Sequence, residues 1–159
     1  MENKKDSFER LVRSHKSTIY TVCYMFSKDE AEVADLFQET LINVWRGLQK
    51  FQGDDEALRA WIYRVALNTC ISLDRSKRSR NTVPLTMDVN LFDPQEGRAQ
   101  RAGQLHSRIV RLQPFDRAIV LLWLEDLSYE EIGQILGISA KNVSVRLVRI
   151  REQLKKMTD

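Results

Sequence analysis

Most of the residues with functional side chains near the C-terminus are basic. Basic side chains in such a group suit binding to phosphate. Residues 139–156 hold six lysines and arginines against one acidic residue, Glu152, whereas the whole chain of 159 residues has a net charge of only +3. Such a local excess suits the phosphate backbone of a nucleic acid, because each basic side chain can replace a bound counterion. The candidate DNA-binding residues of this segment are Lys141, Asn142, Ser144, Val145, Arg146, Val148 and Arg149.

A second basic segment lies in the middle of the chain. Residues 61–80 hold five basic residues and one acidic residue, with Trp61 and Asn68 among them. Arg64, Asn68 and Arg75 recur at helical spacing and therefore share one face of a helix. Basic side chains interleaved with an aromatic ring and an amide suit single-stranded or opened nucleic acid, because any base can stack on an aromatic ring.

No group of residues in the sequence has the spacing of a catalytic or metal-binding site. Cys23 and Cys70 each lie in an apolar helical pattern without a CxxC or Cys/His arrangement, which predicts buried free thiols. His15 and His106 are far apart and neither has a neighbouring ligand at metal spacing. We therefore expect no metal, no cofactor and no small-molecule substrate, and an enzyme is the least favoured class of protein.

The C-terminal basic segment is predicted to be the second helix of a helix-turn-helix. The first helix opens with the capping-box signal of Ser128 and Glu131. Gly137 can adopt the left-handed conformation that ends a helix, and Ser139 is a favourable N-cap for the next one. Over residues 140–155 an apolar stripe recurs at helical spacing and leaves the basic side facing outward. The alternative is a helical hairpin whose basic side is only a solvated face.

The rest of the chain is predicted to be helical as well. It has six glycines, three prolines and no sustained alternation of apolar and polar residues. The expected fold is all-α, with two small helical domains at residues 6–80 and 98–157 joined by an aperiodic, flexible linker at residues 81–97. Because this linker offers little apolar surface, we expect the domains to fold separately and to move relative to each other.

The helix predicted over residues 29–49 has a polar face that could bind a protein. Its buried stripe is expected to include Val44 and Trp45. On another side, polar residues at helical spacing surround an isoleucine. The alternative interpretation is a solvated face with one isolated apolar residue. The candidate protein-binding residues are Asp35, Gln38, Glu39, Ile42 and Arg46.

The composition is that of a soluble globular protein, with 43% hydrophobic and 30% charged residues. No run of residues approaches the roughly 20 apolar residues of a membrane span. The first residues lack the apolar core of a signal peptide. We therefore expect a cytoplasmic protein without a membrane span.

Two blocks of motifs resemble the extracytoplasmic-function (ECF) group of bacterial RNA polymerase sigma factors. The second block resembles sigma region four and includes DLSYEEIG at residues 126–133 and LGIS at residues 136–139. Together the blocks span about residues 6–157, which is nearly the whole chain. The first block resembles sigma region two and consists of ADLFQET at 34–40, VWR at 44–46, FQG at 51–53 and RAWIYRVALN at 59–68.

The resemblance implies a role for each surface. The polar face around Ile42 would dock on core RNA polymerase, and the helix that follows Ser139 would read the -35 element of promoter DNA in the major groove. An anti-sigma factor is a further expected partner. The residues expected at the opened -10 element are Gly53, Asp54, Trp61, Arg64, Asn68, Ser72, Arg75, Lys77 and Arg78.

The sequence departs from the family pattern at two places. Gly133 stands where the family more often has alanine. Ser144 and Val145 stand where the family commonly has a basic residue followed by serine. The second departure replaces hydrogen-bonding groups at base-reading positions.

Two other classes of protein compete with a sigma factor. One is a helix-turn-helix regulator that senses a signal with its N-terminal domain. That class needs a ligand pocket, whereas the basic helix at residues 61–80 favours nucleic acid. The other is a protein that occupies polymerase without starting transcription.

Overall fold

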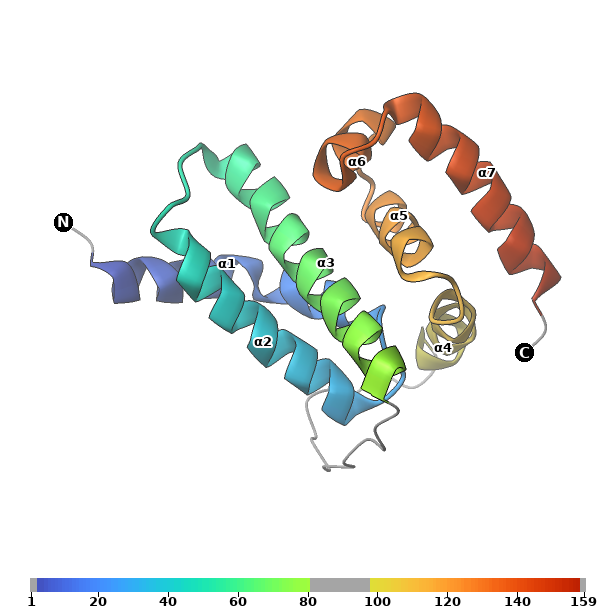
Figure 1. Ribbon diagram of the computed structural model, residues 1–159, viewed down its shortest axis with the longest axis horizontal. Coiled ribbons are helices and arrows are strands. Elements are labelled where there is room, and N and C mark those ends of the chain that lie inside the picture. The colour runs from blue at the N-terminus through green and yellow to red at the C-terminus, as the bar shows by residue number, and fades with distance from the viewer. Residues whose placement is uncertain (1–2, 81–97, 158–159) are drawn as a thin grey trace.

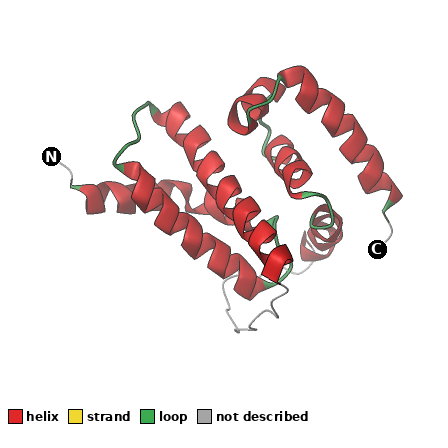
Figure 2. Cartoon of the chain, in the orientation of Figure 1, coloured by secondary structure: helices red, strands yellow, loops and turns green. Residues whose placement is uncertain are grey.

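The computed structural model describes residues 3–80 and 98–157, and the helices of this part of the chain are seven in number. Figures 1 and 2 show no strand among them, and the predicted all-α class is confirmed. The helices of the N-terminal half are α1 (Lys4–Tyr24), α2 (Glu30–Leu48) and α3 (Asp55–Arg80). Those of the C-terminal half are α4 (Arg98–Ile109), α5 (Pro114–Leu124), α6 (Tyr129–Leu136) and α7 (Ala140–Lys156).

Local capping residues set where the helices begin. The side chain of Asp29 accepts a hydrogen bond from the Ala31 amide, 3.0 Å away, so α2 begins as predicted. Helix α1 begins at Lys4, because the side chain of Asn3 accepts a hydrogen bond from the Asp6 amide at 2.8 Å and caps the first turn. Pro114 occupies the first turn of α5, where its missing N–H costs nothing.

The three helices of the N-terminal half pack against one another in pairs. Val44 of α2 is fully buried in their core, but Trp45 is 36% exposed, so its predicted burial is wrong. Adjacent residues of a helix point about 100° apart around its axis, and Trp45 projects to a different side of α2 from Val44. The Trp45 ring instead packs edge-on against Phe8, with ring centroids 5.1 Å apart, and Lys4 places its ammonium 4.1 Å from the ring.

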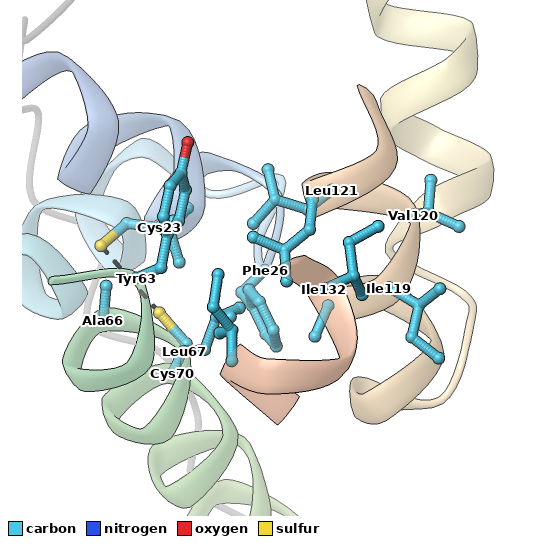
Figure 3. Packing of buried hydrophobic residues seen from close by; sticks show 14 of the residues in the cluster. Cys23, Phe26, Tyr63, Ala66, Leu67, Cys70, Ile119, Val120, Leu121 and Ile132 are labelled. Atoms are coloured by element: carbon cyan, nitrogen blue, oxygen red, sulfur yellow. Dashed lines mark hydrogen bonds between the residues drawn. The ribbon is translucent and has the colours of Figure 1, made fainter. Parts of the chain in front are cut away.

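The predicted buried free thiols are confirmed. Cys23 of α1 and Cys70 of α3 are both fully buried, and their sulfur atoms lie 4.0 Å apart (Figure 3). The contact with Cys23 and the burial of the thiol raise the pKa of Cys70 well above its ordinary value. This pair of cysteines therefore acts as apolar core where α1 meets α3.

Buried residues of the two halves form one hydrophobic cluster. Helix α3 contacts both α5 and α6, which lie alongside it in Figure 1. In the close view of Figure 3, Phe26 and Leu67 of the N-terminal half face Leu121 and Ile132 of the C-terminal half. The apolar surface that joins the halves thus belongs to the helices themselves. The expected linker at residues 81–97 lies outside the described residues.

Candidate nucleic-acid and protein interfaces

Helices α6 and α7 form the predicted helix-turn-helix, and its capping interactions are all present. The Glu131 amide donates to the Ser128 hydroxyl, and the Ser128 amide donates to the Glu131 carboxylate, each at 3.1 Å. These hydrogen bonds hold the pKa of Glu131 below its ordinary value. Gly137 has a φ of 78°, and the Ser139 side chain accepts a bond from the Asn142 amide at 3.1 Å. The second helix is therefore fixed at a defined angle to the first.

The turn between the two helices is closed around Gly133. Its carbonyl oxygen accepts hydrogen bonds from the Gly137 amide at 2.7 Å and from the Ile138 amide at 3.0 Å. A Cβ atom on Gly133 would collide with the carbonyl oxygen of Ile138. This close approach gives a physical reason for the glycine at this position.

Helix α7 buries one side and presents the other to solvent. Val143, Leu147 and Ile150 are buried, whereas Val145 and Val148 are 48% and 63% exposed. Two large apolar side chains on an exposed helix face are a feature of an interaction surface. Of the other predicted DNA-binding residues, Ser144 is half-buried at the edge of this face, and Lys141, Asn142 and Arg149 are exposed on it.

Arg146 is the member of this set whose side chain is held by its own domain. Its Nε donates to the Asn142 side chain at 3.0 Å, and its guanidinium lies 5.1 Å from the centre of the Phe115 ring. One of its terminal nitrogens is 4.0 Å from the Asp116 carboxylate. These contacts leave Arg146 less free than Arg149 to reach a phosphate.

The predicted protein-binding residues of α2 lie together on one face. Asp35, Gln38, Ile42 and Arg46 are exposed, and Glu39 is half-buried beside them. Trp45 is also exposed on α2, and the sequence interpretation missed it because it assigned the ring to the core. Tryptophan is enriched among residues that dominate the binding energy of protein interfaces.

Trp61, Asn68 and Ser72 line a groove of about 400 Å³ between α2 and α3. Gly47 of α2 makes room for the Trp61 ring, since a Cβ atom there would lie 2.8 Å from the indole. Asn43, which the sequence interpretation missed, donates a hydrogen bond of 2.9 Å to the Thr69 hydroxyl on the same groove. An aromatic ring beside amide and hydroxyl groups can stack on a base and hydrogen-bond to its edge.

Three other residues predicted for the -10 element, Arg64, Asp54 and Gly53, do not line this groove. Arg64 of α3 turns away from it, toward α6. Asp54 caps the start of α3 by accepting a 2.8 Å hydrogen bond from the Ala57 amide, and Gly53 is exposed next to it. The side chains of the last three predicted residues, Arg75, Lys77 and Arg78, lie outside the described residues.

Within the described part of the chain, no helix is long and apolar enough to cross a membrane. The same residues contain no group of three histidine, cysteine, aspartate or glutamate side chains that could hold a metal ion.

The fold and its surfaces define an all-helical protein with a helix-turn-helix at its C-terminal end. The model of Sigma-70 region 2 matches residues 11–80, and that of Sigma-70 region 4 matches residues 102–154. The chain belongs to the ECF group of the sigma-70 family.

Curated relatives match the chain over nearly its whole length. The ECF RNA polymerase sigma factor SigE of Mycolicibacterium smegmatis is 30% identical over 94% of this chain, which spans 60% of that protein. The RNA polymerase sigma factor YlaC of Bacillus subtilis is 28% identical over 96% of this chain and 92% of its own length.

Two solved structures share the fold. One is the sigma factor RpoE in complex with the anti-sigma factor NepR from Bartonella quintana, with a TM-score of 0.73 and 20% identity over 94% of this chain and 95% of that one. The other is CnrH in complex with the cytosolic domain of CnrY, with a TM-score of 0.65 and 24% identity over 96% and 87% of the two chains.

Proposed function

We propose that the chain is a sigma factor that binds core RNA polymerase and directs initiation at specific promoters. The observation that carries this proposal is the order of the two matched regions, region 2 at residues 11–80 and region 4 at residues 102–154. Curated relatives over this span are named RNA polymerase sigma factors. The surfaces described above provide one binding face for each step of initiation.

Each step uses a different surface. The exposed face of α2, with Asp35, Gln38 and Ile42, docks on core polymerase. The groove that contains Trp61 and Asn68 receives a base of the opened -10 element by stacking and hydrogen bonding. Helix α7 enters the major groove of the -35 element, as the second helix of a helix-turn-helix does.

The same proposal includes a regulatory partner. RpoE and CnrH were each solved with a second protein, which for RpoE is the anti-sigma factor NepR. We therefore include an anti-sigma factor among the partners of this chain. The proposal places the protein in the cytoplasm, where polymerase and promoter DNA are, and gives it binding functions without a catalysed reaction of its own.

The competing class, a helix-turn-helix regulator with a sensing domain, is less well supported. It does not account for the match of the N-terminal half to region 2.

The test is to add the purified chain to core RNA polymerase and a library of promoter fragments, and to sequence the transcripts. A sigma factor gives transcripts that begin at a shared distance from two sequence elements. The matched control is the folded double variant Asp35→Arg with Gln38→Ala, which should give few transcripts. A chain that bound polymerase without any initiated transcript would instead be a protein that occupies the enzyme.

A further inference from the structure

Arg146 of α7 holds the side chain of Asn142 in one orientation. The two residues are one helical turn apart, and the Arg146 Nε donates a hydrogen bond of 3.0 Å to the Asn142 side-chain oxygen. A guanidinium has five N–H donors and no acceptor, so the amide nitrogen of Asn142 cannot take the place of the oxygen. Asn142 is exposed, and its NH2 group, which carries two donors, therefore remains available to a ligand.

Helix α5 in turn restricts Arg146. Helices α5 and α7 contact each other and lie side by side in Figure 1. The Arg146 guanidinium lies 5.1 Å from the centre of the Phe115 ring, and one of its terminal nitrogens lies 4.0 Å from the Asp116 carboxylate. These contacts from α5 and the bond to Asn142 act on different sides of the same planar group. Arg146 is therefore a positioning residue for the Asn142 amide.

Asn142 lies where a base contact is expected. It belongs to the first turn of α7, and the N-terminal residues of the second helix contact base edges in a helix-turn-helix. Its backbone amide is fixed by a 3.1 Å hydrogen bond to the Ser139 side chain. Val145 and Arg149 follow at three and seven residues and are exposed on the same side of α7. The proposed function turns this side toward the major groove.

The orientation of the amide decides which base it can contact. An asparagine that recognises adenine uses both of its polar atoms, because the oxygen accepts from N6 and the nitrogen donates to N7. In this chain the oxygen is already bonded to a cation, and the amino group of adenine would have to approach beside that positive charge. Guanine presents two acceptors, N7 and O6, at the same edge, and it needs only donors from the protein.

We propose that Asn142 contacts DNA through its NH2 group alone and selects guanine over adenine at one base pair. This selectivity rests on the proposed function, because that function places α7 on duplex DNA. It also goes beyond it, since the residue type by itself would indicate adenine. The bond from Arg146 changes the preferred base without a contact of its own to that base.

Sequence selection from a pool of DNA duplexes with a randomised central segment tests this preference. The full-length chain is mixed with the pool, and the bound duplexes are sequenced. We expect guanine to exceed adenine by about fivefold at one position, which is the low end of the range for a base contact. Asn142→Ala should remove the preference at that position alone. A chain that selects no sequence, or an Asn142→Ala chain that loses a preference for adenine, would overturn the proposal.

Arg146→Met tests the effect of the arginine on the amide. This variant frees the Asn142 oxygen, so adenine should become as favourable as guanine at the same position, and both should stay preferred over cytosine and thymine. Arg149→Met is the matched control, because it removes an exposed arginine from the same side of α7. The control should weaken binding to all sequences and keep the ratio of guanine to adenine. Loss of every preference at that position in Arg146→Met would mean that Arg146 itself contacts the guanine, and would overturn the proposal.

Asn142→Asp provides a test that does not depend on removing Arg146. The carboxylate can keep the bond to Arg146 but has no donor, and an acidic residue in the first turn also suits the helix dipole. The preferred base at that position should change from guanine to cytosine, whose N4 amino group is a donor. A retained preference for guanine would contradict the proposal. Because the selection needs no polymerase, a chain that shows these preferences but yields no transcripts with core polymerase would count against the proposed function alone.

Discussion

Gly133 is the residue on which the turn of the helix-turn-helix depends. Gly133→Ala would gain up to about 1 kcal/mol of helix propensity. The collision of the new methyl group with the Ile138 carbonyl costs about 1–3 kcal/mol, which is the range for overpacked sites. We therefore expect a lower free energy of unfolding, measured by urea denaturation. Gln134→Ala, at an exposed position of the same helix, is the control, and a more stable Gly133→Ala chain would show that the turn is looser than described.

Val148 is 63% exposed on the face of α7 that the proposal places in the major groove. An apolar side chain in that position discriminates bases by contact with a thymine methyl group. Val148→Ala should relax the preference at one thymine of the -35 element by about 1 kcal/mol, measured by fluorescence anisotropy. Uracil in place of that thymine removes only the methyl and should have the same effect. Unchanged affinity with uracil at every -35 position would shift base reading to Ser144 or Asn142.

Arg149 and Arg146 should differ in their contribution to DNA binding. Arg149 is exposed, and Arg149→Ala should weaken binding to all sequences alike and reduce the salt slope by about one unit. Arg146→Ala should reduce the slope less, because that guanidinium already lies against Phe115 and Asp116. The measurement is the affinity for duplex DNA as a function of salt concentration. Equal slopes in the two variants would mean that Arg146 leaves its intramolecular partners when DNA binds.

The exposed face of α2 and the groove between α2 and α3 should serve two separate steps, polymerase binding and promoter opening. Asp35→Arg with Gln38→Ala changes the exposed face of α2 and should weaken binding to core polymerase. Asn68→Ala with Ser72→Ala removes two exposed polar groups of the groove and should leave polymerase binding intact while impairing open-complex formation, measured by permanganate footprinting. If both folded variants lost polymerase binding equally, the assignment of the two faces would be wrong.

Local patterns predict the helices well because each helix end is determined by nearby residues. Ser128, Ser139, Asp29 and Pro114 cap or begin helices as their types indicate. Periodicity also places Val145 and Val148 on an exposed face correctly. These features depend on residues within one or two turns of each other, which is the range that sequence spacing describes.

The contacts between elements were harder to predict. Sequence spacing shows which residues share a helix face, but it does not show which element packs against that face. Trp45 was expected in the buried stripe of α2 beside Val44, yet its ring packs on Phe8 and stays 36% exposed. Arg64 shares a helix with Asn68, yet it bonds to α6 while Asn68 lines the groove. Arg117 stands among apolar residues of α5, and no local pattern indicates that its partners lie in the other half.

At the scale of the whole molecule, the expectation of two independently moving domains rested on residues 81–97 alone. The apolar surface that joins the halves comes from residues such as Leu67 and Ile132, which sequence patterns assign to the core of each half. A periodic stripe cannot show whether it packs within a domain or between domains. The separate folding of the two regions stays a prediction.

His106 of α4, which stacks on Tyr24 of α1, should make the packing of the two halves dependent on pH. Burial lowers the pKa of His106, and the Lys28 ammonium acts in the same direction, while hydrogen bonds to the Tyr24 and Ser27 carbonyls oppose them. When the halves separate, the pKa returns toward its ordinary value of 6.5, so the separated form binds more protons at acidic pH. The packing of the halves is therefore strongest above that value and weakens as the pH falls below it.

Energy transfer between dyes on Glu9→Cys of α1 and Lys155→Cys of α7, two exposed positions, measures this effect directly. Transfer in the free chain should fall as the pH is lowered from about 8 to about 5.5, across the ordinary histidine pKa. His106→Gln keeps a hydrogen-bond donor without a titrating ring and should flatten the response. A flat profile in the original chain would mean that His106 does not help to hold the two halves together.

The hydrophobic cluster shared by the two halves couples the thermal stability of the protein to the ease with which the halves separate. A substitution that packs this cluster more tightly raises the melting temperature. The same substitution lowers the fraction of molecules in which the two halves are apart. A looser core has the opposite effect on both properties. Selection for higher stability and selection for easier separation of the halves would therefore favour opposite substitutions at the same buried residues.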